Sequence, residues 1–256
     1  MGTRALSESD GRQALTVVGL VAALPEELRM LTRHALVPGS CARLSEGLWV
    51  SLSGIGPQRA VAAGEQLLAN GATALVSWGN AGALDGRLAA GDLMLPRQII
   101  GSDGSLYWAD KRWHGRLCER LAGRFTVHTG ALAQSPCLVA TRTEKRSLHN
   151  RVRAMAVDME SGALAQLAAR RRVPYLAVRA ITDTAVMGIP RSVVNAIDAA
   201  GRVRLMRLLG GILMHPGDLR ALVHLGRNFR AARSTLARLA ADSAADLLAS
   251  HPRAHL

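Results

Sequence analysis

Short apolar runs alternate with amphipathic stretches along most of this chain. The runs are rich in Val, Leu, Ile and Ala, which is typical of strands buried on both faces of a sheet. Strands are predicted at 16–22, 48–52, 74–77, 93–95, 155–157 and 175–181. Helical patterns cover 57–69, 143–152 and 160–170, and Pro25 opens a further one through PEELRMLTRHAL. Segments 125–133 and 137–140 look extended, and 99–124 is less regular.

Helices that alternate with strands through short loops predict an α/β fold. We expect a single-domain, three-layer α/β/α arrangement around a central mixed β-sheet. Residues 1–14 read as a polar leader and 15–198 as the domain, with an amphipathic helical extension at 199–256. Residues 15–24 also resemble a short signal sequence, but removing them would remove the acidic pair that follows, so a buried first strand is favoured.

The pattern changes after Val203. Leucine and isoleucine recur at helical spacing up to Pro216-Gly217, and a second helical pattern follows. Its polar positions carry Arg220, Arg227, Arg230, Arg233 and Arg238. A basic amphipathic helix of this kind either lies on an anionic membrane surface or packs on the domain with its arginines in water. The pattern leaves both readings open.

Composition narrows the possible partners. The 256 residues are 49% hydrophobic and 20% charged, as in a globular protein, and the net charge is +13. Lys111 and Lys145 are the only lysines, so the charge comes from arginine, and no nucleic-acid motif accompanies it. The three cysteines form no C-x-x-C pair and the histidines show no ligand spacing. We therefore expect the protein to bind no nucleic acid, metal or cofactor. We expect it in the cytoplasm, either free or on the inner face of the membrane.

Acidic residues follow three of the predicted strands. Glu26 and Glu27 come after the first, Asp158 and Glu160 after 155–157, and Asp183 after 175–181. Ligands of open α/β sheets bind at the carboxyl ends of strands, so these acids predict one shared crevice. The glycine turns 54–56 and 79–82 also follow strands and allow a ligand to approach the backbone.

These residues carry a family resemblance. The strings VAALPEELRML, SGIG, GNAGALDGRLAAGDLMLP, AMAVDMESGALAQLA and VPYLAVRAITDTA occur in order over residues 16–190. The chain resembles the nucleoside phosphorylase superfamily, and within it the methylthioadenosine/S-adenosylhomocysteine nucleosidases. The resemblance implies cleavage of the N-glycosidic bond of a purine nucleoside by an enzyme that forms homo-oligomers.

The resemblance also implies roles for individual residues. Asp183 would donate a proton to N7 of the purine, which requires a protonated carboxyl, and Glu27 would deprotonate the attacking water. Glu160 would accept hydrogen bonds from the ribose hydroxyls. The other substrate-binding positions are Met159 against the sugar or base, Asn80, Ala81 and Gly82 near the reacting carbon, and Val139 and Ala140 along the base.

The chain departs from the family at two points. Asn80 stands where the nucleosidases commonly have serine. The phosphorylases hold phosphate with arginines near the glycine turns, whereas VGLVAALPEE and ALVSWGNAG contain none. We therefore favour water as the nucleophile, with phosphate as the alternative co-substrate if an arginine arrives from elsewhere.

A narrower likeness concerns the substrate. The ALPEE string and the tail GRVRLMRLLGGILMHPGDLRALVHLGRNFRAA resemble the hopanoid-associated phosphorylases. These act on adenosylhopane, a nucleoside with a polycyclic lipid at its 5′ end, and release adenine. Two alternatives remain: a soluble purine nucleoside such as methylthioadenosine as the substrate, and a non-catalytic nucleoside- or lipid-binding protein.

Overall fold

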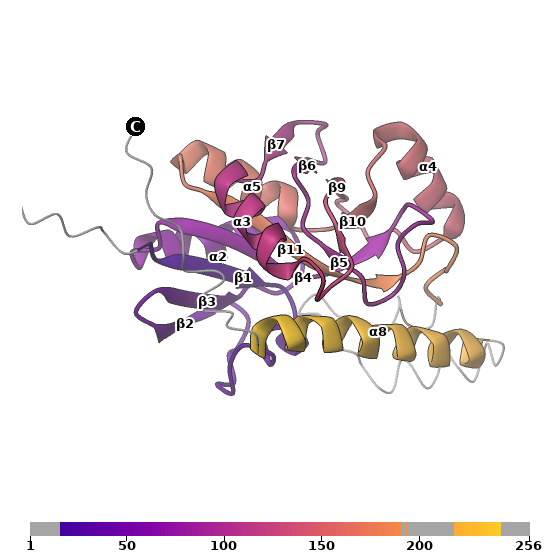
Figure 1. Ribbon diagram of the computed structural model, residues 1–256, viewed down its shortest axis with the longest axis horizontal. Helices are drawn as coiled ribbons and strands as arrows, with labels where there is room; N and C mark the ends of the chain where they lie inside the picture. The colour runs from indigo at the N-terminus through magenta and orange to yellow at the C-terminus, as the bar shows by residue number, and fades with distance from the viewer. Residues whose placement is uncertain (1–15, 191–192, 194–217, 242–256) are drawn as a thin grey trace, which may run out of the picture.

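Eleven strands form one mixed sheet in the computed structural model, which describes residues 16–190, 193 and 218–241 (Figure 1). The strands are β1 (Val18–Ala22), β2 (Ser40–Ser45), β3 (Leu48–Leu52), β4 (Ala74–Ala83), β5 (Leu93–Met94), β6 (Gln98–Ile100), β7 (Leu106–Trp108), β8 (Val127–His128), β9 (Ala131–Gln134), β10 (Ala156–Asp158) and β11 (Tyr175–Asp183). The predicted mixed sheet is therefore confirmed.

The strand order brings the acidic strand ends together. β1 lies between β3 and β4 and is parallel to both, while β11 is parallel to β4. β10 runs antiparallel to the end of β4, where Val157 pairs with Gly82. The carboxyl ends of β1, β4 and β11 thus lie at one edge, and Asp158 at the end of β10 reaches the same place.

Helices cover both faces of the sheet, as the α/β/α prediction requires. Helices α3 (Lys111–Leu121) and α8 (Asp218–Ala241) pack with one set of strand side chains, including Leu20 and Val178. Helices α2 (Pro57–Ala69) and α5 (Ser161–Arg171) pack on the other face, against residues such as Leu75. Helix α4 (Arg142–Val152) closes a smaller cluster through Leu148.

Several local predictions were wrong. The helix opened by Pro25 is only α1 (Pro25–Leu28), and a hydrogen-bonded turn follows in which the Leu28 carbonyl accepts from the N–H groups of Leu31 and Thr32. Segment 137–140 forms no strand, since the Ser135 side chain bonds both the N–H and the carbonyl of Cys137 in a turn. Residues 79–82 continue β4 rather than forming a turn.

The region 99–124 is more regular than predicted. It contains β7 and α3, and Asp110 caps α3 by accepting a bond from the Trp113 N–H at 2.8 Å. Trp113, Leu117 and Leu121 recur every four residues and are buried, which is a helical signal that the sequence did contain.

Helix α8 packs along the sheet (Figure 1). Leu225, Ala232, Leu236 and Leu239 are buried on its inner face, while its outer face exposes Val223 and Phe229. In the ranges that the structure describes, no helix has the length and apolar character to span a membrane. The first helical pattern of the extension, 203–215, lies outside the described residues.

Replacing Leu236 with Ala tests this packing. The side chain is 1% exposed, so we expect the free energy of unfolding to fall by about 2–5 kcal/mol in urea titrations. The matched Val223→Ala change lies on the outer face and should alter stability by less than about 0.5 kcal/mol. Equal effects of the two changes would show that the helix is not docked in solution.

Candidate active site

A buried arginine joins the elements around the acidic strand ends. Arg179 lies within β11, is 3% exposed, and donates from Nε to Asp158 Oδ2 at 2.8 Å. Its Nη2 group donates to the hydroxyls of Ser77 on β4 and Ser161 at the start of α5. A buried cation requires such partners, so this network fixes β4, β10, β11 and α5 relative to one another.

Glu27 is held by four N–H donors. Its Oε2 accepts from the backbone of Ala23 and Leu24 at 3.1 and 3.0 Å, as in a helix cap. Its Oε1 accepts from the backbone and side-chain amide of Asn80, both at 2.9 Å. Burial raises the pKa of the carboxyl, and the charge of Arg179 and the N–H bonds oppose that rise. A buried base with a raised pKa suits proton abstraction near neutral pH.

Gly79 makes the approach of Glu27 possible. Its φ is +153°, and a Cβ at this position would lie 2.5 Å from Glu27 Oε1. Any side chain here would push the carboxylate away from β4, so glycine is required.

Glu160 lies across from Glu27. Its Oε1 accepts from the Gly56 N–H at 2.8 Å, so the glycine turn before α2 positions the carboxylate. Burial, and then the negative charge of Asp158, raise the pKa of Glu160 to about 7. One carboxylate oxygen is thus engaged by the backbone, and Glu160 shares a small cavity with Glu27 and Asn80.

Asp183 ends β11 beside Gly82. A β-bulge between Ile181 and Asp183 sets the direction of the side chain, and Asp183 is 4% exposed. Its Oδ1 accepts from the Thr182 hydroxyl at 2.8 Å, and its Oδ2 forms an ion pair with Lys145. The predicted burial is confirmed. The ion pair with Lys145 was not predicted.

The predicted residues fall into two neighbouring cavities. One contains Glu27, Asn80 and Glu160, and the other contains Gly82, Val139, Met159 and Asp183. The Asp158–Arg179 pair joins them, since each cavity is lined by one partner. Ala81 and Ala140 line neither cavity: the Ala81 carbonyl accepts from Thr182, and that of Ala140 accepts from Ile189.

The two cavities are small, at about 20 and 50 Å³, whereas ligand pockets occupy roughly 300–1,000 Å³. Cys137, Leu138 and Ile189 also line the second cavity, and Cys137 and Leu138 are exposed.

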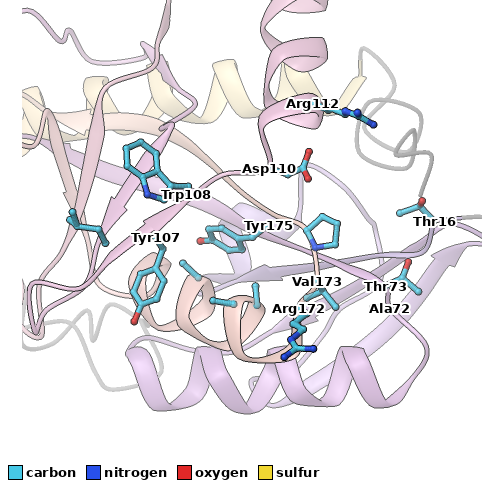
Figure 2. A pocket seen from close by; sticks show the side chains of 15 residues that line it. Thr16, Ala72, Thr73, Tyr107, Trp108, Asp110, Arg112, Arg172, Val173 and Tyr175 are labelled. Carbon is cyan, nitrogen blue, oxygen red and sulfur yellow. The ribbon is translucent and has the colours of Figure 1, made fainter. Parts of the chain in front are cut away.

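A larger cavity of about 900 Å³ lies at the opposite edge of the sheet (Figure 2). Thr16, Thr73 and Tyr175 line it at the amino ends of β1, β4 and β11, beside the exposed Trp108. Its one acidic side chain, Asp110, caps α3. This cavity lacks the group of carboxylates, so we place the site at the carboxyl edge. Within the described ranges, no three His, Cys, Asp or Glu side chains are arranged to hold a metal ion.

Sequence reasoning missed three buried side chains that contact the predicted acids or their neighbours: Arg179, Lys145 and Ser161. An arginine inside the apolar strand YLAVRAITD was a signal that could have been read. Lys145 gave no comparable signal, because most residues of α4 are polar and exposed and Leu148 is its one buried apolar residue.

The amino-acid sequence is similar to those of known enzymes. A model of the phosphorylase superfamily matches residues 17–208. The 5′-methylthioadenosine/S-adenosylhomocysteine nucleosidases of Mycobacterium bovis and Mycobacterium tuberculosis are each 26% identical over 66% of this chain and 86% of their own length.

Solved structures share the fold. The same nucleosidase from Neisseria meningitidis, in complex with methylthio-immucillin-A, has a TM-score of 0.66 and 18% identity over 89% of this chain and 98% of its own. Futalosine hydrolase of Helicobacter pylori has a TM-score of 0.62 and 18% identity over 90% of this chain and 98% of its own.

The raised pKa of Glu160 predicts a pH-dependent cost in stability. The value of about 7 lies above the ordinary 4.5, so the folded state binds the proton more tightly than the unfolded state. Stability should therefore fall as the pH rises through 7. Glu160→Gln removes this dependence, and at pH 8.5 we expect it to be more stable than the wild type by on the order of 1–2 kcal/mol.

Urea unfolding between about pH 5 and 8.5 measures this difference. Glu26→Gln changes the exposed neighbour of Glu27 and serves as the control, which should follow the wild type. Parallel stability curves for Glu160→Gln and the wild type would contradict the assigned burial of this carboxyl.

Proposed function

The chain belongs to the phosphorylase superfamily, and from this premise and the carboxylate geometry we propose that it hydrolyses the N-glycosidic bond of a purine nucleoside. The supporting observation is that Glu27, Glu160 and Asp183 lie around one short stretch of β4. Glu27 is bound at Asn80 and Asp183 lies against Gly82. Two residues of a strand span about 7 Å, which suits a nucleoside placed between the two acids.

Each carboxyl has a separate part in the proposed reaction. Asp183 lies in the cavity with Met159 and Val139, where the purine would lie, and passes a proton to N7. The C1′–N9 electron pair then leaves with a neutral base. Glu160 accepts hydrogen bonds from the ribose hydroxyls. Glu27 takes a proton from water as the water oxygen bonds to C1′.

The surroundings of Glu27 favour water over phosphate. Arg179 is the cation whose charge acts most directly on Glu27, and Asp158 already engages it. A second cation lies near the first glycine turn, however. Arg59 of α2 packs against Gly54, where a Cβ would lie 2.9 Å from its Nη1. Phosphate therefore remains the alternative co-substrate.

A lipid-linked nucleoside, adenosylhopane, is the proposed substrate. Its support is the outer face of α8, which exposes Arg227, Arg230 and Arg233 beside Phe229, with no acidic residue between 221 and 241. The inner face of the same helix contacts the segment that follows Asp183, because Asn228 Nδ2 lies 3.3 Å from Met187 Sδ. A helix on an anionic bilayer would thus bring the crevice close to a membrane-held substrate.

Product analysis tests the reaction and the substrate together. Purified protein is given adenosylhopane in vesicles or methylthioadenosine in solution, each with and without phosphate, and adenine is measured. We expect faster adenine release from adenosylhopane, without a need for phosphate. Asp183→Asn should lower the rate by about 10²- to 10⁴-fold, because Asn cannot protonate the base.

Other results would each correct a separate part of the proposal. Adenine release only with phosphate would make the protein a phosphorylase. Faster cleavage of methylthioadenosine would remove the lipid-linked substrate. Unchanged activity of Asp183→Asn would assign the proton to another acid.

Vesicle flotation tests the role of α8. Wild-type protein should bind phosphatidylglycerol vesicles and not phosphatidylcholine vesicles. Replacing Arg227, Arg230 and Arg233 with Gln should weaken binding by about 3 kcal/mol, or roughly 100-fold, at about 1 kcal/mol per arginine. The control carries three Gln substitutions at exposed arginines on other helices: Arg112, Arg120 and Arg170. Equal loss in the two triple variants would show that only net charge matters.

A further inference from the structure

Lys145 is the one buried lysine of the described structure. Lysine side chains are rarely enclosed unless paired, yet Lys145 on α4 is 0% exposed, whereas Lys111 is exposed. None of the roles considered above uses Lys145, so its burial requires an explanation.

The ammonium group of Lys145 has three acceptors. It forms the ion pair with Asp183 Oδ2, and it donates to the carbonyls of Thr184 at 2.7 Å and Met187 at 3.0 Å. All three donors are thereby used. Lys145 thus binds both the side chain at the end of β11 and the backbone that follows it. Asn228 of α8 contacts Met187 through its sulfur, so two helices hold this segment.

Structural support alone does not require a lysine here. Burying two charges is costly, and apolar side chains of similar volume often stabilise a core equally well. The other charged or titratable groups around the same cavity are Asp158, which pairs with Arg179, and the thiol of Cys137. Neither Arg179 nor Cys137 is bonded to Asp183, whereas Lys145 contacts its carboxylate directly.

We propose that Lys145 is a positioning residue of the site: through its ion pair with Oδ2 and its two hydrogen bonds to the backbone after β11, it holds the Asp183 carboxyl in the orientation from which a proton passes to the base. The inference rests on the proposed function, since it assigns to Asp183 the proton passed to the base. Lys145 acts through Asp183, and its own contacts are with the protein rather than with the substrate.

Separate measurement of kcat and KM for adenine release tests this role. Lys145→Met keeps the side-chain length and removes the bonds to Asp183 Oδ2 and to the backbone after β11. We expect kcat to fall about 10- to 100-fold, because the carboxyl is less well held. KM should stay nearly unchanged, because Lys145 contacts the protein rather than the substrate. Lys145→Arg retains a cation and should restore kcat, and Lys111→Met is the control.

A Lys145→Met variant whose kcat equals that of the wild type would overturn the proposal and leave Lys145 a purely structural role. If the single variant does not fold, the double variant Lys145→Met/Asp183→Asn removes both charges and leaves neither unpaired. Its residual activity should equal that of Asp183→Asn alone, because Lys145 acts through the carboxyl. A further loss in the double variant would contradict the proposal.

A spectroscopic measurement separates this inference from the proposed function. With only two lysines, protein labelled with ¹⁵N at lysine Nζ gives two side-chain signals. Asp183→Asn should shift the Lys145 signal and leave that of Lys111 unchanged, and adding adenine should also shift only the Lys145 signal. A Lys145 signal that moves in a protein that releases no adenine would refute the reaction and retain the pairing. A signal that does not move would refute the pairing itself.

Discussion

The rest of the site depends on the buried ion pair between Arg179 and Asp158. Removing a guanidinium from water is costly unless its donors are bonded, and the carboxylate of Asp158 with the hydroxyls of Ser77 and Ser161 meets that need. The partners come from β4, β10 and α5, so the network holds these elements in one arrangement. The two cavities meet across this pair, and its positive partner opposes the burial cost of Glu27 and Glu160.

Two further carboxylates remain expensive to bury. Burial raises the pKa of both Glu27 and Glu160, even though backbone N–H groups bind each of them. Buried carboxylates that lower the stability of the fold are common at binding and catalytic sites, because their charged forms act on a ligand rather than on the fold. Asp183 is also buried, but its charge is balanced by the ion pair with Lys145. The site thus holds acids in distinct environments, which suits their distinct parts in the proposed reaction.

The sequence predicted the layers and the meeting of the strand ends because both follow from local patterns. Apolar runs such as 175–181 mark buried strands, and the carboxyl ends of parallel strands meet at one edge. It did not predict that α1 would end at Leu28, because the apolar and polar pattern of PEELRMLTRHAL is the same for a full helix as for one turn of helix followed by a hydrogen-bonded turn. Nor did it predict Lys145 beside Asp183, since the two are 38 residues apart and their contact depends on how α4 packs.

A crystal structure of the protein with a non-hydrolysable adenine nucleoside tests the central claim most directly. The account predicts that the ligand lies at the carboxyl edge, with its ribose hydroxyls on Glu160 and N7 of its base within hydrogen-bond distance of Asp183. A nucleoside bound instead in the cavity beside Trp108 and Tyr175, with the three carboxylates untouched, would contradict it.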